Sequence, residues 1–276
     1  MQLTYTKMQG AGNQILVVDR RKASTVPPPD DVIKRMGGAE LGPGFDQLLW
    51  LAPARHDSSA ASYRVFNADG SEVEQCGNGV RCIARFLARE NDSVREFVFD
   101  SPAGPIETRV LDDDLISVNM GPPQFDPARV PFVTDVQADR YTLDVAGERF
   151  DVAILSMGNP HCVLEVDAVV TADVAGLGPL IETHKRFPAR TNVGFMQLRD
   201  RAHIELRVYE RGAGETLACG TGACAAVVAG HRQDRLDDEV AVQLPGGELV
   251  VSWRGGSEPV WLTGDAEILS EGIIDL

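Results

Sequence analysis

Short apolar runs separated by Gly, Pro and Asn dominate the first half of the chain, a pattern typical of β-strands joined by turns. A short helix is predicted over residues 30–36, after three consecutive prolines. Two segments rich in glycine and polar residues, 7–14 and 37–47, are predicted to be loops. The apolar runs predict strands at residues 3–5, 15–18, 48–51, 94–99, 106–111 and 115–120.

The second half of the chain has the same pattern of short apolar runs separated by turn residues. Residues 167–184 are predicted to form a helix that is interrupted at Gly176, Gly178 and Pro179. Because strands outnumber helices, the fold class is predicted to be α+β with a mainly antiparallel sheet. Strands are predicted at residues 151–157, 161–166, 192–198, 203–209, 240–244, 248–253 and 260–262.

Gly121-Pro122-Pro123 separates the two halves and predicts a domain boundary. We therefore expect one domain over residues 1–120 and a second over 121–263. Residues 264–276 are expected to return to the first domain as a terminal strand.

The strongest signal is an internal repeat. Residues 63–82, YRVFNADGSEVEQCGNGVRC, resemble residues 206–224, LRVYERGAGETLACGTGAC, and at an offset of 143 residues 63–81 align on 206–224 without a gap. Each copy consists of an apolar strand, a loop with glycine and acidic residues, and Cys-Gly-polar-Gly at the start of a helix. The repeat places Cys76 and Cys219 at equivalent positions, and Asn67 at the position of Glu210.

The helices that follow these cysteines are predicted to be buried. A helix that is apolar on all sides lies inside a protein, and the second helix has almost no polar face between residues 223 and 229. Each cysteine is therefore predicted to lie at the start of a helix held in a core. In the first helix, the spacing of a packed face is shown by Val80, Ile83, Ala84 and Leu87.

A free cysteine is most often a small buried side chain, and Cys82, Cys162 and Cys224 are interpreted in this way. Cys76 and Cys219 differ because each precedes a Gly-x-Gly helix start. Unpaired backbone N–H groups and the helix dipole favour a thiolate there and lower the thiol pKa. The same N–H groups can bind a carboxylate. The repeat therefore favours a pair of reactive thiols.

Other polar residues have two interpretations. His161 fits either a buried structural histidine or a functional one, and Glu210 and Arg211 fit a plain ion pair at a strand end. Asparagine is common in turns for conformational reasons, which applies to Asn13, Asn67, Asn78, Asn159 and Asn192.

Composition excludes several classes of function. A net charge of −15 opposes a nucleic-acid-binding surface, and no apolar run approaches the roughly 18 residues of a membrane helix. The first residues lack the apolar core of a signal peptide. With an odd number of cysteines, five, these features predict reduced thiols in the cytoplasm.

No metal or cofactor is expected. The cysteines lack Cys-x-x-Cys spacing, and there is no paired histidine motif. The glycine-rich segments lack the third glycine of a dinucleotide fingerprint and the Gly-Lys of a phosphate loop. No lysine lies in an evident site for pyridoxal phosphate.

Six motifs in order along the whole chain resemble those of the diaminopimelate epimerase family: KMQGAGN, GPGFDQ, FNADGSEVEQCGNGVRC, GNPHC, FPARTNVGF and YERGAGETLACGTGACA. The first motif retains Asn13 but departs from the family pattern at Gln9, Gln14 and Ile15, where His and Asp-Phe are usual. The resemblance implies two similar domains, each a strongly curved sheet around a central helix, with the active site in the cleft. It also implies a cofactor-independent homodimer that interconverts LL- and meso-diaminopimelate, in lysine and peptidoglycan precursor biosynthesis.

The resemblance further implies that Cys76 and Cys219 are the catalytic pair, one as thiolate and one as thiol. Backbone N–H groups at Gly77-Asn78 and Gly220-Thr221 would bind the substrate carboxylate next to the reacting carbon. His161 and Glu210 would tune the thiols, and Arg211 suits the distal carboxylate. The implied substrate-binding side chains are those of Asn13, Gln47, Asn67, Asn159, Asn192, Glu210 and Arg211.

Alternative functions remain open. A proline or hydroxyproline racemase would share the paired Cys-Gly-x-Gly motifs, although Glu210, Arg211 and the asparagines suit a substrate with a second amino-acid end. An isomerase of the phenazine pathway would share the domain pair but lack the thiols. A thiol–disulfide oxidoreductase would normally use Cys-x-x-Cys, and an amino-acid-binding protein would not need both thiols.

Overall fold

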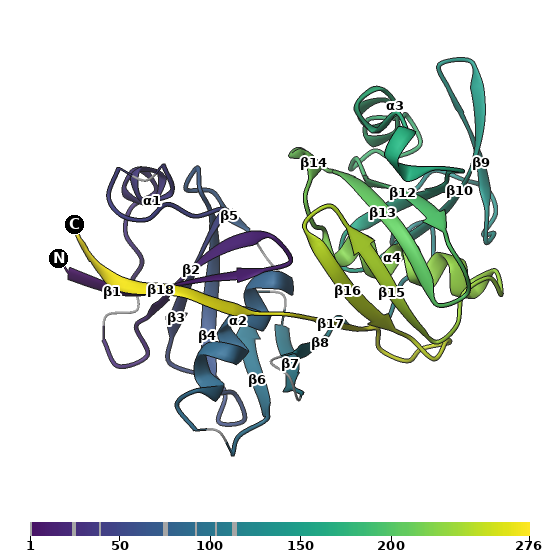
Figure 1. Ribbon diagram of the computed structural model, residues 1–276. Coiled ribbons are helices and arrows are strands. Elements are labelled where there is room, and N and C mark those ends of the chain that lie inside the picture. The colour runs from purple at the N-terminus through teal and green to yellow at the C-terminus, as the bar shows by residue number, and fades with distance from the viewer. Residues whose placement is uncertain are drawn as a thin grey trace. The chain divides into compact units, whose positions relative to one another are not determined.

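The structure is a computed structural model of the 276-residue chain (Figure 1). The chain divides into two compact units, Met1–Asn119 with Thr263–Leu276, and Met120–Leu262. Each unit contains helices and a mainly antiparallel sheet, as the fold prediction requires. No helix in the described part of the chain is long and apolar enough to cross a membrane. The residues described are 2–23, 26–38, 40–73, 77–91, 93–102, 104–111 and 115–276.

The first unit is built on a sheet that begins with the last strand of the chain. Its elements are β1 (Gln2–Gly10), β2 (Asn13–Asp19), α1 (Asp30–Gly37), β3 (Gln47–Ala52), β4 (Ala61–Asn67), β5 (Glu72–Val73), α2 (Gly77–Ala88), β6 (Glu96–Ser101), β7 (Gly104–Val110), β8 (Ile116–Asn119) and β18 (Glu267–Asp275). The strands pair in the order β18-β1-β2-β3-β4-β6-β7-β8, with β5 beside β4. Among these pairings of the described residues, β2–β3 and β4–β6 are parallel and the others are antiparallel.

The second unit repeats this topology. Its elements are β9 (Tyr141–Val145), β10 (Glu148–Ser156), β11 (Pro160–Glu165), the 3-10 helix η2 (Val169–Thr171), α3 (Val174–Glu182), β12 (Asn192–Leu198), β13 (His203–Glu210), β14 (Gly214–Thr216), α4 (Gly220–Arg232), β15 (Glu239–Leu244) and β16 (Gly247–Ser252), followed by β17 (Trp261–Gly264). The strands pair in the order β9-β10-β11-β12-β13-β15-β16, with β14 beside β13. Among these pairings, β11–β12 and β13–β15 are again the parallel ones.

The internal repeat extends further in the structure than in the sequence. Ala61 pairs with Phe99 between β4 and β6, and Ile204 pairs with Val242 between β13 and β15. Both residues of the second pair follow those of the first by 143 positions, the offset of the cysteine motifs. The next hairpins, β6–β7 and β15–β16, keep this offset. The backbone register is therefore conserved between the units where side-chain identity is not.

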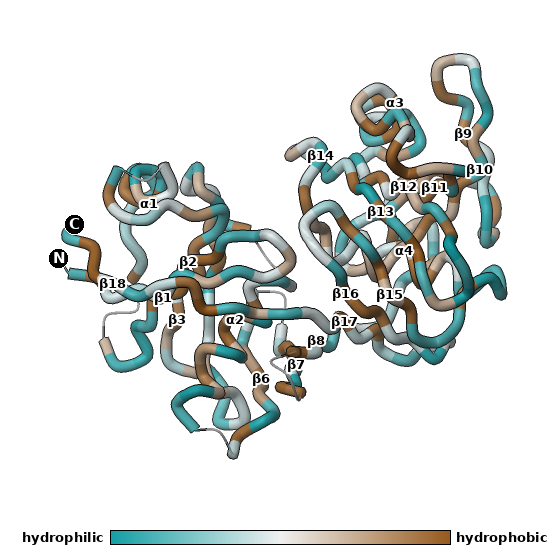
Figure 2. Tube along the Cα trace, in the orientation of Figure 1, coloured by the Kyte–Doolittle hydropathy of each residue, from teal (hydrophilic) through white to brown (hydrophobic). Residues whose placement is uncertain are grey.

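The helix that follows each cysteine motif lies in the core of its unit, as predicted. Every residue of α4 from Gly222 to Gly230 is buried, and the helix contacts β10, β11, β12, β13 and β16. Most of α2 is likewise buried against β1, β2, β3, β7 and β8. Figure 2 shows hydrophobic stretches alternating with hydrophilic ones along the strands of each unit. This alternation turns one face of the strands toward the helix.

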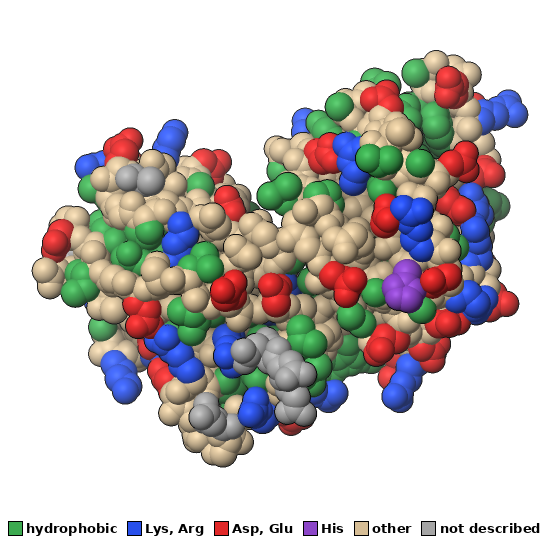
Figure 3. Space-filling model, in the orientation of Figure 1, with side chains coloured by type: hydrophobic (Ala, Val, Ile, Leu, Met, Phe, Trp, Pro, Cys, Tyr) green, Lys and Arg blue, Asp and Glu red, His purple; other side chains and the backbone are tan. Residues whose placement is uncertain are grey.

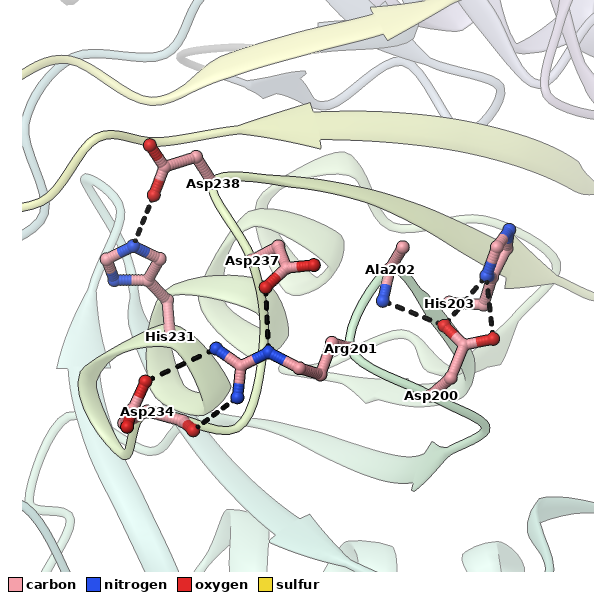
Figure 4. Close-up of polar contacts among 8 residues, drawn as sticks. All are labelled: Asp200, Arg201, Ala202, His203, His231, Asp234, Asp237 and Asp238. Atoms are coloured by element: carbon pink, nitrogen blue, oxygen red, sulfur yellow. Dashed lines mark hydrogen bonds and ion pairs between the residues drawn. The ribbon is translucent and has the colours of Figure 1, made fainter.

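Polar contacts at the surface hold the last turn of α4 (Figure 4). The Nε2 atom of His231 lies 2.9 Å from Oδ1 of Asp238. Arg201, in the β12–β13 connection, donates to Oδ1 of Asp237 at 2.8 Å and to the backbone oxygen of Asp234 at 2.8 Å. Exposed pairs of this kind contribute little to stability because water screens their charges. They tie the helix end to a neighbouring hairpin, while the core supplies most of the stability.

Charged side chains are interspersed on the visible face of each unit in Figure 3. Acidic groups outnumber basic ones, 41 to 26, in the whole chain. On this face they lie among uncharged surface, with Lys and Arg between them. The negative net charge is thus spread over this face of each unit.

The segment 7–14, predicted to be a loop, is a β-hairpin instead. β1 continues to Gly10, β2 begins at Asn13, and these two residues pair. Only Ala11 and Gly12 form the turn, with φ values of 48° and 83°. Two-residue turns with positive φ at both positions match the twist of antiparallel strands. The glycine-rich composition therefore concealed a tight turn.

The helix predicted over 167–184 is shorter and differently interrupted. The break falls at Asp173, which caps α3 by accepting the N–H of Gly176 at 2.9 Å. Gly178 and Pro179 lie inside α3 and do not interrupt it. A Cβ atom at position 178 would lie 2.6 Å from the ring of Tyr209. Glycine is present here because the helix packs directly on β13.

The strand β9 has no counterpart in the sequence prediction. Its five residues alternate buried and exposed, and Ala146 and Gly147 form a turn with positive φ before β10. Only Tyr141, Leu143 and Val145 are apolar. An alternating run this short between polar segments is a weak signal for a strand.

Replacing a core valine of α4 should destabilise the second unit. Val228 is fully buried, so Val228→Ala removes two buried methyl groups and leaves a cavity, at a cost of about 2 kcal/mol in unfolding free energy. Urea denaturation followed by circular dichroism measures this change. Val133 is 58% exposed, so Val133→Ala serves as the control and should change the free energy by less than about 0.5 kcal/mol. Equal effects of the two substitutions would contradict the assigned core.

Candidate active site

Cys219 occupies the N-cap position of α4. Its backbone is extended, with φ −122° and ψ 105°, and its carbonyl oxygen accepts the N–H of Ala223 at 2.9 Å. A Cβ atom at Gly222 would lie 3.3 Å from Sγ of Cys219 and 2.9 Å from Cγ2 of Val208. The second glycine of Cys-Gly-x-Gly is therefore required because the first helical turn passes directly beside the thiol.

The thiol of Cys219 has a raised pKa, contrary to the lowered value that the sequence predicts. Burial raises the pKa well above the usual 9.0, and the carboxylate of Glu210 raises it further. Hydrogen bonds from the Thr221 hydroxyl and the Gly222 N–H act in the opposite direction. The sequence revealed the helix start but not the depth of burial or the facing carboxylate, and these outweigh the helix dipole.

A chain of polar contacts leads from Cys219 to His161. Sγ of Cys219 lies 3.6 Å from Oγ1 of Thr221, and Nδ2 of Asn159 donates to the same hydroxyl at 3.3 Å. Oδ1 of Asn159 lies 2.9 Å from Nε2 of His161. Because an amide oxygen only accepts, Nε2 carries the proton in this arrangement. The structure thus brings four candidate residues, His161, Asn159, Thr221 and Cys219, into one chain of contacts.

His161 is uncharged in the folded protein. The side chain is 1% exposed. Burial, with a smaller contribution from the positive charge of Arg211, lowers its pKa from 6.5 to about 3. A neutral imidazole can orient Asn159 and polarise the contacts of the thiol without adding a charge.

Asn192 joins three strand ends and holds Arg211. Its Oδ1 accepts the backbone N–H of Arg211 at 3.0 Å, and its Nδ2 donates to the carbonyl of Pro160 at 2.9 Å. The guanidinium of Arg211 donates to the carbonyl of Ala189 at 3.3 Å. Asn192 is 3% exposed. Much of its hydrogen-bonding capacity is therefore used to position other groups of the site.

Glu210 ends β13 and is held by Thr216 of β14. The Thr216 hydroxyl donates to Oε1 of Glu210 in a short hydrogen bond. Sequence reasoning missed Thr216, although the repeat contains a signal. Thr216 corresponds to Val73, and Glu210 to Asn67, so the hydroxyl occurs only in the copy that has the carboxylate.

In the first unit, the corresponding residues form a second polar group. Nε2 of Gln47 donates to Oδ1 of Asn67 at 3.2 Å, and Nδ2 of Asn67 donates to Oγ of Ser71 at 3.0 Å. Oδ1 of Asn78 and Oε1 of Gln47 are buried without a partner among the described residues. A buried acceptor left without a donor costs roughly 1–3 kcal/mol, so each of these oxygens has capacity for a further hydrogen bond. Asn13, partly buried, begins β2 at the hairpin turn.

Cys76 lies outside the described residues, and α2 begins at Gly77 directly after it. Cys82, Cys162 and Cys224 are buried, as predicted for structural cysteines, and burial raises the pKa of the Cys162 thiol. Within the described ranges, no three His, Cys, Asp or Glu side chains are grouped as metal ligands.

Strand register relates the candidate residues of the two units. In the parallel pair β2–β3 of the first unit, Ile15 lies opposite Gln47. In the parallel pair β11–β12 of the second unit, His161 lies opposite Asn192. In the antiparallel step that follows, Gln47 pairs with Asn67. Between β12 and β13, Val193 pairs with Tyr209, so the next position in this antiparallel register places Asn192 opposite Glu210. Three pairs of candidate residues are therefore equivalent: Asn13 with Asn159, Gln47 with Asn192, and Asn67 with Glu210.

A bidentate Arg–Glu ion pair joins the two strands of the hairpin before each buried helix, β4–β5 before α2 and β13–β14 before α4. Arg64 contacts Glu72 through Nε and a terminal nitrogen at 2.6 and 2.7 Å. Arg207 contacts Glu215 in the same manner at 2.6 and 2.9 Å. Paired N–H···O contacts of this type fix orientation as well as distance. Each hairpin is thus held in one geometry before the chain reaches the cysteine.

Stability should fall in mild acid because of His161. The folded-state pKa of about 3 lies below the usual 6.5, so the unfolded chain takes up this proton more readily. The contribution is complete above pH 6.5 and is lost as the pH falls toward 3, with a slope approaching about 1.4 kcal/mol per pH unit. Urea denaturation between pH 7 and pH 5 measures the slope. His161→Gln should flatten it, and identical slopes for the two proteins would contradict the assignment.

Removing the charge of Glu210 should make Cys219 more reactive. Glu210→Gln removes a cause of the raised thiol pKa, so a larger fraction is thiolate at a given pH and iodoacetamide should alkylate Cys219 faster. Mass spectrometry of the Cys219 peptide measures the rate. Glu215→Gln is the matched control, since Glu215 lies in the same hairpin and pairs with Arg207. Equal rates for the two variants would rule out the electrostatic coupling.

Comparisons with known proteins identify the family of this chain. The chain is 51% identical to a diaminopimelate epimerase of Laribacter hongkongensis (strain HLHK9) and 49% identical to one of Ectopseudomonas mendocina (strain ymp), each over 100% of both chains. Solved structures with the same fold include a probable proline racemase of Agrobacterium radiobacter K84, with a TM-score of 0.67 at 16% identity over 98% of this chain and 92% of that one. Another is a methylitaconate-delta-isomerase, with a TM-score of 0.69 at 14% identity over 99% and 95%. The family model described as diaminopimelate epimerase matches residues 5–126 and 153–269, and the chain therefore belongs to the diaminopimelate epimerase family.

Proposed function

We propose that this protein interconverts LL- and meso-diaminopimelate without a cofactor, using Cys76 and Cys219 as its two acid/base groups. Family membership supports the reaction. The observation that carries the mechanism is the placement of Cys219, a buried thiol at the start of α4 that faces Glu210 and is linked through Thr221 and Asn159 to His161.

Inversion at an α-carbon requires a base on one face and an acid on the other. In one direction, the Cys76 thiolate removes the α-proton while the Sγ–H of Cys219 delivers its proton to the opposite face, and the reverse reaction exchanges the roles. The raised pKa of Cys219 supports its assignment as the protonated partner in the resting enzyme. General acid–base catalysis contributes only about 10²–10⁴-fold, so other stabilisation is also needed.

The starts of α2 and α4 supply that stabilisation in our proposal. The first N–H groups of a helix have no partner within it and attract an anion. The N–H groups at Gly77-Asn78 and Gly220-Thr221 would hold the carboxylate beside the reacting carbon as negative charge develops on it. One such donor is worth roughly 10²–10³-fold in rate.

The distal carboxylate and ammonium groups of the substrate would be recognised by side chains of complementary charge. Arg211 is exposed, carries a forked guanidinium that suits a carboxylate, and is held by Asn192 and Ala189. Glu210, Asn67 and the unpartnered Oε1 of Gln47 supply acceptors for an ammonium group. Asn13 and Asn159, at equivalent places in the repeat, complete the proposed set.

The substrate class follows from the family, whose members act on a small molecule. We further expect a homodimer that acts in the cytoplasm, in the synthesis of lysine and of peptidoglycan precursors. Both expectations derive from the resemblance of the motifs.

The purified protein should interconvert LL- and meso-diaminopimelate with no added cofactor. Product formed in heavy water should carry deuterium at the inverted carbon, because the donated proton comes from a thiol that exchanges with solvent. Cys76→Ala and Cys219→Ala should each reduce turnover by more than about 10³-fold because each removes an obligatory acid/base group, while circular dichroism shows retained folding. Chiral chromatography with mass detection measures both quantities.

L-Proline and trans-4-hydroxy-L-proline serve as control substrates in the same assay. They test the alternative, an imino-acid racemase on the shared fold, and we expect no conversion of either. Turnover of proline but not of diaminopimelate would replace the proposed function. Substantial activity of either cysteine variant would exclude the two-thiol mechanism.

A further inference from the structure

Glu182 is a buried carboxylate that the proposed chemistry does not use. Its side chain is 7% exposed, although it lies at the end of a helix. It is the last residue of α3, where the negative end of the helix dipole disfavours an anion. A carboxylate kept in so unfavourable a place requires specific partners, and its partners lie on both sides of Arg211.

The first partner is the turn that follows Arg211. Oε1 of Glu182 accepts the backbone N–H of Gly212 at 2.8 Å. Gly212 has a φ of 77°, so this N–H points away from the regular ladder between β13 and β14. A hydrogen bond from a backbone N–H to a carboxylate is stronger than one to a neutral acceptor. Glu182 therefore fixes the backbone one residue beyond the guanidinium-bearing position.

The second partner is the segment that contacts Arg211 from the other side. The guanidinium of Arg190 lies 3.5 Å from Oε1 of Glu182. Arg190 directly follows Ala189, whose carbonyl accepts from the Arg211 guanidinium, and lies two residues before Asn192, whose Oδ1 accepts the Arg211 N–H. Glu182 thus contacts both segments that determine where the Arg211 side chain can lie.

The helix itself sets the position of Glu182. α3 packs against β13 at Gly178, where a Cβ atom would lie 2.6 Å from the ring of Tyr209. Because Tyr209 lies two residues before Arg211, the helix and the arginine share one rigid support. The carboxylate therefore has a fixed distance to the turn, as a brace requires.

We propose that Glu182 is a positioning residue that orients Arg211 and so sets the affinity of the site for the second carboxylate of the substrate. The inference rests on the proposed function, in which Arg211 binds that carboxylate. Among the described residues, the polar contacts of Glu182 are with Gly212 and Arg190, not with Cys219. Its loss should weaken binding of the substrate and leave the proton transfers largely intact.

Glu182→Leu keeps the side-chain volume but removes both acceptor oxygens. We expect KM for LL-diaminopimelate to rise by about tenfold or more while kcat stays within about twofold of wild type, the pattern of lost binding that is common to ground and transition states. Glu182→Gln retains an oxygen for the Gly212 N–H, so its KM should stay within about threefold. Steady-state kinetics by chiral chromatography measures both constants.

A structural role alone would give a different result. Partial unfolding lowers the amount of active enzyme, which reduces apparent kcat and leaves KM unchanged, and that outcome for Glu182→Leu would overturn the proposal. If Glu182→Leu does not fold, Glu182→Asp replaces it, since its shorter side chain retains the charge but not the reach to Gly212. An unchanged KM in Glu182→Asp would then be equally decisive against the proposal.

Glu205→Leu is the matched control. Glu205 pairs with Arg199 on the surface of the same unit, and its replacement should leave both constants within about twofold of wild type, as for most surface substitutions. The wild-type assay separates the two hypotheses. An inactive wild type would refute the proposed function, whereas an active wild type with an unaltered KM in the Glu182 variants would refute only the role of Glu182.

Discussion

The burial of α4 among the strands of the second unit determines the properties of its half of the site. A helix enclosed on all sides cannot rotate or shift without disrupting the core, so Cys219 and the first N–H groups of the helix have one fixed position. The strands that enclose α4 end in Glu210 and begin at Pro160 and Asn192. Hydrophobic packing therefore brings polar groups from distant parts of the sequence together around one helix start.

The same burial sets the chemistry of the thiol. A helix N-terminus favours a thiolate, but removal from water disfavours any isolated charge, and a nearby carboxylate adds to the penalty. In Cys219 the second and third effects prevail. His161 responds to the same environment by remaining neutral. The site thus keeps both groups uncharged, Cys219 as a protonated thiol and His161 as a neutral imidazole.

Much of the architecture was predictable because local patterns and tertiary packing agree. The buried helices, most strands and the paired cysteine motifs follow from apolar periodicity and from the repeat. The hairpin at Ala11 and Gly12 and the continuous α3 around Pro179 did not follow, because turn geometry and contact with Tyr209 decide them. Sequence patterns record which residues avoid water, but they do not record backbone angles or long-range contacts.

The site shows a similar division. The residue types and their order indicated the candidates. Strand register now shows that Asn13 of the first unit is equivalent to Asn159 of the second, and Gln47 to Asn192. The direction of the Cys219 pKa shift and the contact of Thr216 with Glu210 depend on distances across strands, which no single motif contains.

The pairing of β1 with β18 has a consequence for the order in which the protein forms during synthesis. The second unit is one continuous stretch of chain, and all of its strands are synthesised before residue 267. β1 must wait for β18 with one edge uncovered, and an uncovered strand edge invites pairing with other chains. The nascent first unit is therefore the stage at which this protein is most exposed to aggregation, and the final strand ends that exposure.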